Sequence, residues 1–180
     1  MVYKYDEIIK KYGSDYKLKK AIENNEIFKI EKGLYSDIKY TSDLEIITKK
    51  FPDAIFSMSS AFYFYNLTTV IPKKYQLAIN KKRRKIEIEN IELLYISESF
   101  FEVGKTILET HNTKINIYDK ERLLIELIRN KNKISYDLYK EVLNNFREII
   151  DDLDLRRIEE YLKLFRYRKS IIEAIRKEVY

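Results

Sequence analysis

The spacing of the hydrophobic residues changes twice along this chain, and that change most strongly limits the folds it can adopt. In the first 65 residues and again in the last third, apolar residues recur three and four positions apart, as on one face of an α-helix. Between about residues 75 and 117 the spacing is closer to two, which is typical of β-strands. The order of helices, then strands, then helices predicts an α+β protein.

The first forty residues contain two predicted helices followed by a hairpin. An apolar stripe at 5–12 ends at Gly13, and Ser14 is an N-cap residue that opens a second helix with its apolar side at 18, 21 and 22. Residues 27–30 predict a strand, Lys32-Gly33 a tight turn and residues 34–35 the return strand. Helix, short turn, helix and hairpin is the order of a winged helix-turn-helix.

We therefore predict an N-terminal winged-helix head at residues 1–40, or extending to about residue 70, and a body at residues 41–180. Forty residues are too few to hold a core alone, so the head is expected to pack on a helix at 43–50 or on the body. That helix opens at the capping box Ser42-Asp-Leu-Glu45 and ends at Phe51-Pro52.

The body is predicted to be a mixed domain with a small antiparallel sheet and a C-terminal helical segment. A further helix is expected at 59–65, and after residue 119 four apolar stripes predict four helices. The expected strands are 75–79, 85–89, 93–97 and 114–117.

Composition excludes several kinds of chemistry. The chain has no cysteine, which excludes disulfides, thiolate catalysis and cysteine-based zinc sites. Its single histidine, His111, lies in a polar loop pattern, no glycine-rich phosphate loop is present, and no Glu-x-Lys triplet occurs as a metal-dependent nuclease would want. The N-terminus lacks a signal-peptide pattern, and no apolar run approaches the ~18 residues needed to span a membrane. We expect a cytoplasmic, non-enzymatic protein without cofactor or metal.

The charge distribution favours a polyanionic partner. The net charge is +6 and the pI about 9.1, although the many lysines also fit the codon usage of an A/T-rich genome. Residues 54–85 contain seven basic side chains and no acid, whereas residues 86–119 contain seven acids against two lysines. This asymmetry indicates one basic face.

The second predicted helix is the candidate for reading DNA. Lys17 and Lys20 are three residues apart and share a face, with Tyr16 and Lys19 beside them. In helix-turn-helix proteins the second helix enters the major groove, so Tyr16, Lys17 and Lys20 are the predicted base readers. The same lysines would also suit the solvent-exposed face of an ordinary amphipathic helix, and the order of the elements favours DNA binding.

Phosphate contacts are predicted around the same helix and at a second, weaker site. Ser14 and Lys19 flank the base readers, and Lys29 and Lys32 flank the turn of the hairpin, where they could clamp the DNA backbone. A secondary basic run is expected at a hairpin turn, where it is either a solvated loop or a second contact surface. It consists of Lys81, Lys82, Arg83, Arg84 and Lys85.

Three segments of the chain resemble the AbiE-type abortive-infection antitoxins. Residues 28–35 (FKIEKGLY) resemble the strand–turn–strand that closes the family's winged helix, and residues 60–68 (SAFYFYNLT) resemble its next block, with Asn66 where a glycine is more usual. Residues 119–130 (DKERLLIELIRN) resemble its C-terminal helix motif. Family members usually carry another helix before the helix pair, whereas only about a dozen residues precede Gly13 here.

The resemblance implies the antitoxin of a toxin–antitoxin pair. Its winged helix would repress its own promoter at inverted repeats in double-stranded DNA. Its C-terminal domain would counter a nucleotidyltransferase-like toxin without forming a stable complex with it. A stand-alone winged-helix regulator, whose body binds a ligand or a protein, is the alternative function, and an unrecognised enzyme is the third hypothesis.

Overall fold

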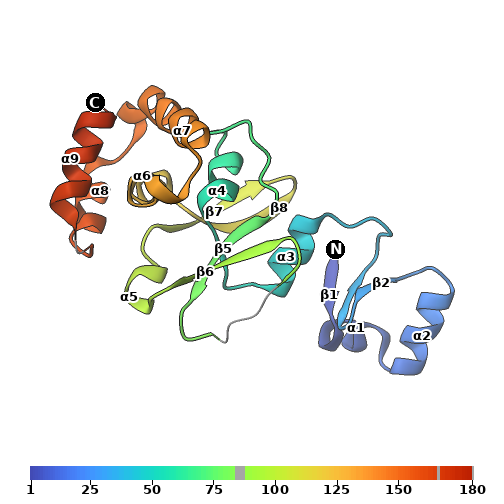
Figure 1. Cartoon of the computed structure of the whole chain (residues 1–180). Coiled ribbons are helices and arrows are strands. Elements are labelled where there is room, and N and C mark those ends of the chain that lie inside the picture. The colour runs from blue at the N-terminus through green and yellow to red at the C-terminus, as the bar shows by residue number, and fades with distance from the viewer. Residues whose placement is uncertain (84–87, 166, 180) are drawn as a thin grey trace. The chain divides into compact units, whose positions relative to one another are not determined.

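The chain consists of two compact units, Met1–Pro52 and Asp53–Tyr180 (Figure 1). The computed structural model describes residues 1–83, 88–165 and 167–179. Both units combine helices with a β-sheet, so the fold is α+β. The division after Pro52 lies between the two expected ends of the head, residue 40 and about residue 70, and the helix expected at 43–50 belongs to the first unit.

The first unit is a three-stranded antiparallel sheet with three helices. Its elements are β1 (Val2–Lys4), α1 (Tyr5–Tyr12), α2 (Asp15–Glu23), β2 (Phe28–Glu31), β3 (Leu34–Ser36) and α3 (Asp43–Lys50). All were expected within two residues except β1, which pairs with β3 and gives the sheet the order β1-β3-β2. Gly13 ends α1 with a φ of 84°, a conformation that costs little only for glycine.

The core of the first unit lies between the sheet and the helix pair. It contains Ile8, Leu18, Ala21, Ile27 and Tyr35, all buried. Helix α3 packs against β1 and buries its own apolar residues, and two ion pairs link its last turn to the rest of the unit. The expectation that the first forty residues pack on the helix at 43–50 is therefore confirmed.

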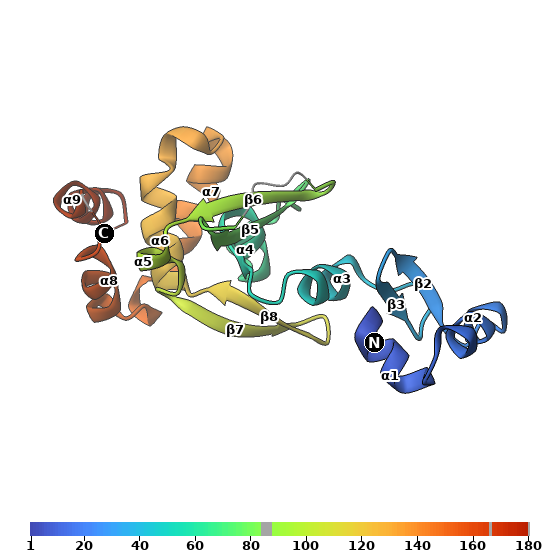
Figure 2. The ribbon, with the colours of Figure 1, turned by 90° about the horizontal axis from the view of Figure 1, so that it is seen from below.

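The second unit contains a five-stranded sheet and most of the helices (Figures 1 and 2). Its strands are β4 (Ile55–Phe56), β5 (Tyr75–Asn80), β6 (Ile91–Ile96), β7 (Lys105–Thr110) and β8 (Thr113–Tyr118). Its helices are α4 (Met58–Phe64), α5 (Glu98–Phe101), α6 (Lys120–Arg129), α7 (Tyr136–Glu148), α8 (Leu155–Leu162) and α9 (Arg168–Glu178). The helices expected at 59–65 and after residue 119 are confirmed.

The five-stranded sheet is mixed, which corrects the expectation of a small antiparallel sheet in the body. Its order is β6-β5-β4-β8-β7, with β5–β6 and β4–β8 parallel and the other two pairs antiparallel. A hairpin in which the run at 81–85 returns the chain to pair with β5 is also wrong, because both edges of β5 are occupied, by β4 and by the parallel β6. Residues 84 and 85 of that run lie outside the described residues. The expected strand 85–89 lies largely outside the described residues.

Helix α6 is the centre of the second unit. It lies between the sheet and the α8–α9 pair in both views (Figures 1 and 2), and every residue from Glu121 to Leu127 is buried. Asp119 caps it by accepting a hydrogen bond from the backbone N–H of Arg122. Within the described ranges, no helix is both long and apolar enough to cross a membrane.

Candidate nucleic-acid interface

The outward face of α2 is centred on Tyr16 and Lys20. Leu18 and Ala21 point into the core, and at 100° per residue Tyr16 and Lys20 lie on the opposite side of the helix. Tyr16 is 66% exposed, and the Nζ of Lys20 lies 4.9 Å from the centroid of its ring. The structure therefore brings together two of the three predicted base readers, with Lys17 on the flank of the same helix.

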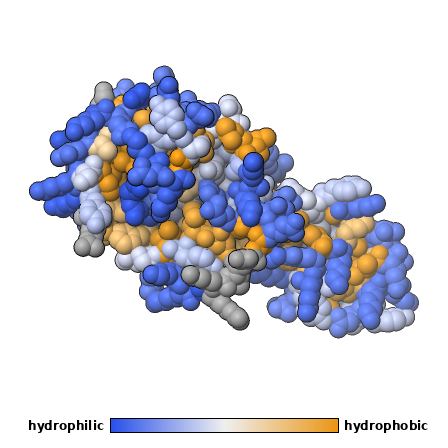
Figure 3. All heavy atoms as spheres, viewed as in Figure 1, coloured by the Kyte–Doolittle hydropathy of each residue, from blue (hydrophilic) through white to orange (hydrophobic). Residues whose placement is uncertain are grey.

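The other predicted lysines of the first unit are exposed and carry uncompensated charge. Hydrophilic side chains cover the outer edge of this unit, where α2 lies (Figure 3). The lysines at 17, 19, 29 and 32 are all exposed, and no ion pair joins any of them to another residue in the described part of the chain. Unpaired ammonium groups on one small unit produce a positive potential that attracts polyanions.

Several acids of the same unit are already engaged elsewhere. The Glu7 carboxylate binds Lys49 at 2.7 Å, and this contact holds the pKa of Glu7 below its usual range. Glu31 pairs with Lys50 at 2.7 Å. The amino group of Met1 binds Asp37 and lowers the pKa of that carboxyl. These three carboxylates are therefore not available to neutralise the lysines of α2 or of the hairpin.

The β2–β3 hairpin presents its lysines beside the helix pair. Lys29 lies opposite Tyr35 in the antiparallel register, so both side chains are on the same face of the sheet. Tyr35 packs on α1 and α2, which places Lys29 on the helix side. Lys32 precedes Gly33, whose φ of 82° makes the tight turn, and it extends into solvent at the tip of the hairpin.

The charged residues of α2 are unevenly distributed along the helix. The three basic residues, Lys17, Lys19 and Lys20, lie within the first six positions, after Asp15, whose carboxylate accepts a hydrogen bond from Tyr5. Glu23 and Glu26 are exposed at and just beyond the C-terminal end. Glu23 and Glu26 would repel a phosphate backbone at the C-terminal end, whereas the three lysines would attract it. The N-terminal half is therefore the half suited to meet DNA.

Ser14 holds the start of α2. Its hydroxyl oxygen accepts a hydrogen bond from the backbone N–H of Lys17 at 3.3 Å, which leaves the hydroxyl proton free to donate to a phosphate. Tyr5, which sequence reasoning missed, donates its hydroxyl to Asp15 at 2.7 Å and ties the beginning of α1 to the beginning of α2. This hydrogen bond raises the pKa of Tyr5. No local pattern could have found a contact across ten residues and a turn.

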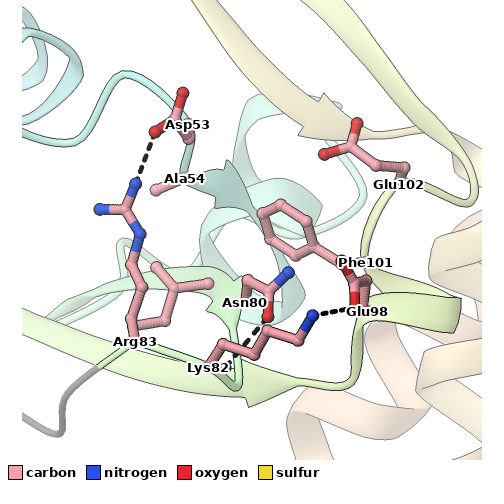
Figure 4. Close-up of a pocket in the computed structure, with 9 residues that line it drawn as sticks. Asp53, Ala54, Asn80, Lys82, Arg83, Glu98, Phe101 and Glu102 are labelled. Carbon is pink, nitrogen blue, oxygen red and sulfur yellow. Dashed lines mark hydrogen bonds and ion pairs between the residues drawn. The ribbon is translucent and has the colours of Figure 1, made fainter.

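The described part of the secondary basic run is largely paired. Arg83 binds Asp53 and Lys82 binds Glu98 across a cavity of about 430 Å³ in the second unit (Figure 4). Asn80 accepts a hydrogen bond from the backbone N–H of Lys82. Lys81 is exposed, and Arg84 and Lys85 lie outside the described residues. Two of the three described cations therefore have carboxylate partners, which makes this run a poorer phosphate contact than α2.

The single histidine, His111, lies at the surface of the second unit. His111 is exposed in the β7–β8 turn with a φ of 48°, and its Nδ1 lies 3.0 Å from the hydroxyl of Thr110. In the described segments, no group of three or more histidine, cysteine or acidic side chains is arranged to hold a metal ion.

A second cavity of about 440 Å³ lies beside β6 in the second unit. Its wall includes Glu92, which accepts a hydrogen bond from Gln76, and Glu126, which is paired with Arg129. Met58, at the same wall, has a φ of 48°, which is uncommon for a residue other than glycine or asparagine. A volume of this size is in the range of small-molecule sites.

No model of a known protein family matches the chain, and no curated protein sequence is significantly similar to it. The functional inference therefore rests on the residues and their geometry.

Proposed function

We propose that this chain is the antitoxin of an AbiE-like toxin–antitoxin pair. In this proposal the first unit is a winged helix-turn-helix that binds inverted repeats in the chain's own promoter and represses it. The second unit counters a nucleotidyltransferase-like toxin without a stable complex. No step requires a cofactor or catalysis by this chain.

The basic outward face of α2 carries the DNA-binding half of the proposal. Two helices joined by a short turn and followed by a hairpin have the element order of a winged helix-turn-helix, and β1 widens the hairpin into a three-stranded sheet. On this scaffold α2 occupies the position of the recognition helix. Its exposed lysines have no carboxylate partner in the described part of the first unit, as phosphate or base contacts would require.

The antitoxin half of the proposal is supported by the secondary structure of the three segments that resemble the AbiE-type family. Residues 28–35 form the β2–β3 hairpin, and residues 60–68 cover most of α4 and the turn after it. Asn66, where the family more usually has glycine, has a φ of 56°, which fits a position that favours glycine. Residues 119–130 form α6 with its cap, the most buried helix of the second unit.

One experiment with two readouts tests both halves. The DNA upstream of the gene and the neighbouring reading frame are placed in a host with or without this chain. We expect the chain to repress a reporter driven by that DNA and to restore growth when the neighbouring frame is toxic. A chain that neither binds the upstream DNA nor restores growth would refute the proposal.

The cavity beside β6 favours a second candidate, a stand-alone regulator whose body binds a small molecule. Its volume and the unusual backbone of Met58 are the observations behind this alternative. The two functions differ in the co-expression readout. A regulator would repress the reporter but leave the toxicity of the neighbouring frame unchanged.

A further inference from the structure

Tyr16 and Lys20 form a composite side-chain pair on the outermost line of α2. The two residues are four apart, and the Lys20 ammonium lies 4.9 Å from the centroid of the Tyr16 ring. Long side chains in helices lean toward the N-terminus, which carries the ammonium back over the preceding turn. The pair thus presents an aromatic ring and a cation at one place, in the N-terminal half of the helix.

The Lys20 ammonium contacts this ring and not an acid of the described residues. Glu23 lies three residues further along the same outward face, at a spacing that permits an ion pair. Lys20 nevertheless makes no ion pair with Glu23. The ring therefore orders the cation without neutralising it, because the contact contributes no negative charge.

We propose that this pair sets the sequence specificity of DNA binding by recognising a thymine next to a guanine in the major groove. The inference rests on the proposed DNA-binding function. An aromatic ring makes apolar contact with the C5-methyl group of thymine, and a lysine ammonium donates to O6 and N7 of guanine. One helical turn is 5.4 Å and neighbouring base pairs are 3.4 Å apart, so a cation leaning over the ring reaches the adjacent base pair.

Lys17 and the hairpin lysines then have a different task. Lys17 lies on the flank of α2, Lys29 and Lys32 lie on the hairpin, and none of their ammonium groups lies over an aromatic ring of the described residues. Free ammonium groups on flexible stems suit phosphates, which position the protein but carry no base identity.

The test uses the full-length chain and duplexes with single-atom changes. Selection from random-sequence DNA first gives the preferred site. Binding is then measured by fluorescence anisotropy on that site, on a copy with uracil in place of the contacted thymine, and on a copy with 7-deazaguanine. Loss of the methyl group should weaken wild-type binding about fourfold, and loss of the guanine N7 about tenfold.

Substitutions assign these effects to the pair. Tyr16→Ala should bind thymine and uracil sites equally, and Tyr16→Phe should keep the wild-type preference because it keeps the ring. Lys20→Ala should no longer distinguish guanine from 7-deazaguanine. The matched control is Tyr40→Ala, since Tyr40 also lies near a lysine ammonium, that of Lys39 at 5.6 Å, but outside α2. This control should keep both preferences.

The possible results distinguish failure of the proposed DNA-binding function from failure of the proposed base recognition. A wild-type chain that selects no DNA overturns the proposed function and this inference with it. A chain that binds a selected site but is indifferent to both base analogues overturns the inference alone. The same holds if Tyr16→Ala, shown to be folded by circular dichroism, still prefers thymine to uracil.

Discussion

Helices α2 and α6 each carry basic side chains, but the lysines of α2 and Arg122 of α6 lie in opposite surroundings. On α2 the lysines point into solvent, and the outermost cation rests on a tyrosine ring. On α6 Arg122 is 1% exposed, with its guanidinium close to the rings of Tyr118 and Phe165. It donates hydrogen bonds to the Glu126 carboxylate and to the backbone carbonyls of Phe100 and Val103.

The difference teaches that a count of cations does not locate a polyanion site. Arg122 of α6 is bonded to buried groups of the fold, and two of the three described cations in the run at 81–83 already have carboxylate partners at the surface. Only charges without an internal partner remain for a ligand. This comparison predicts opposite consequences when each set of charges is removed.

The largest effect is expected at Arg122. Arg122→Ala leaves the Glu126 carboxylate buried with less of its counter-charge and two carbonyls without their donor, so the free energy of unfolding should fall by about 3–5 kcal/mol. Urea denaturation followed by circular dichroism measures the loss. Arg156→Ala, at an exposed position on α8, is the control and should change stability by less than about 0.5 kcal/mol. A loss below 1 kcal/mol at Arg122 would contradict its assignment as a structural cation.

The second-largest effect is expected for Tyr35→Ala, which should lower the free energy of unfolding by about 3 kcal/mol. Its ring is 8% exposed and packs with Ile8, Leu18 and Ile27, so its removal opens a cavity between the hairpin and the helix pair. Chemical denaturation measures this change in the free energy of unfolding. The exposed Tyr40 is the matched control, and a Tyr35 variant as stable as the Tyr40 variant would show that the ring does not anchor the hairpin.

A smaller loss of stability is expected at low pH, when Glu141 becomes protonated. The backbone N–H of Thr69 and the hydroxyl of Thr68 donate to this carboxylate and lower its pKa. A carboxyl whose pKa is lower in the folded state stabilises above its unfolded pKa of about 4.3, and that stability is lost as the pH falls through the folded value.

The pH dependence is tested with two variants of α7. Denaturation midpoints measured between pH 7 and pH 3 should decline less steeply on the acid side in Glu141→Gln than in the wild type. Asn145→Ala removes the neighbouring contact to the carbonyl of Leu67 without removing a titrating group, so it should keep the wild-type decline. Equal slopes in all three proteins would rule out this contribution.

The smallest change in stability is expected for the double variant Lys17→Ala/Lys20→Ala. Both side chains are exposed and neither forms an ion pair with the described residues, so the free energy of unfolding should change by no more than about 0.5 kcal/mol. Repression of the promoter should nevertheless be lost, while rescue from the toxin persists. A folded double variant that still represses would break the comparison between α2 and α6.

The sequence predicted the elements with strong local signals. The helical stripes, the caps at Ser14 and Ser42, and the turn at Gly33 depend on neighbours within one or two turns, and all are found where the pattern placed them. Strand β1 could not be predicted in this way, because three residues have no period and its partner β3 is more than thirty residues away. The two-residue strand β4 could not be predicted either, because it is too short to show a period.

One missed strand had a usable signal. Strand β7 is joined to β8 by His111 and Asn112, both with positive φ, which is the geometry of a two-residue hairpin turn. Thr106 and Ile107 are β-branched, as strand residues often are. For the candidate site, the sequence predicted only part of the arrangement. The spacing of Tyr16 and Lys20 can be read from the sequence. Whether the lysines have carboxylate partners cannot, because the nearby acids pair with residues far away in the sequence.

The salt dependence of DNA binding tests the central claim most directly, which is that the unpaired lysines of the first unit hold the phosphate backbone. Three or four phosphate contacts per head and two heads on an inverted repeat give a slope of log K against log salt near −6, at about −0.9 per contact. Lys32→Ala should make the slope shallower by about one unit per head on operator and scrambled DNA alike. Lys82→Ala/Arg83→Ala should leave it unchanged, since both cations are already paired. A slope unaffected by Lys32→Ala but reduced by the Lys82/Arg83 variant would contradict the account and move the interface to the second unit.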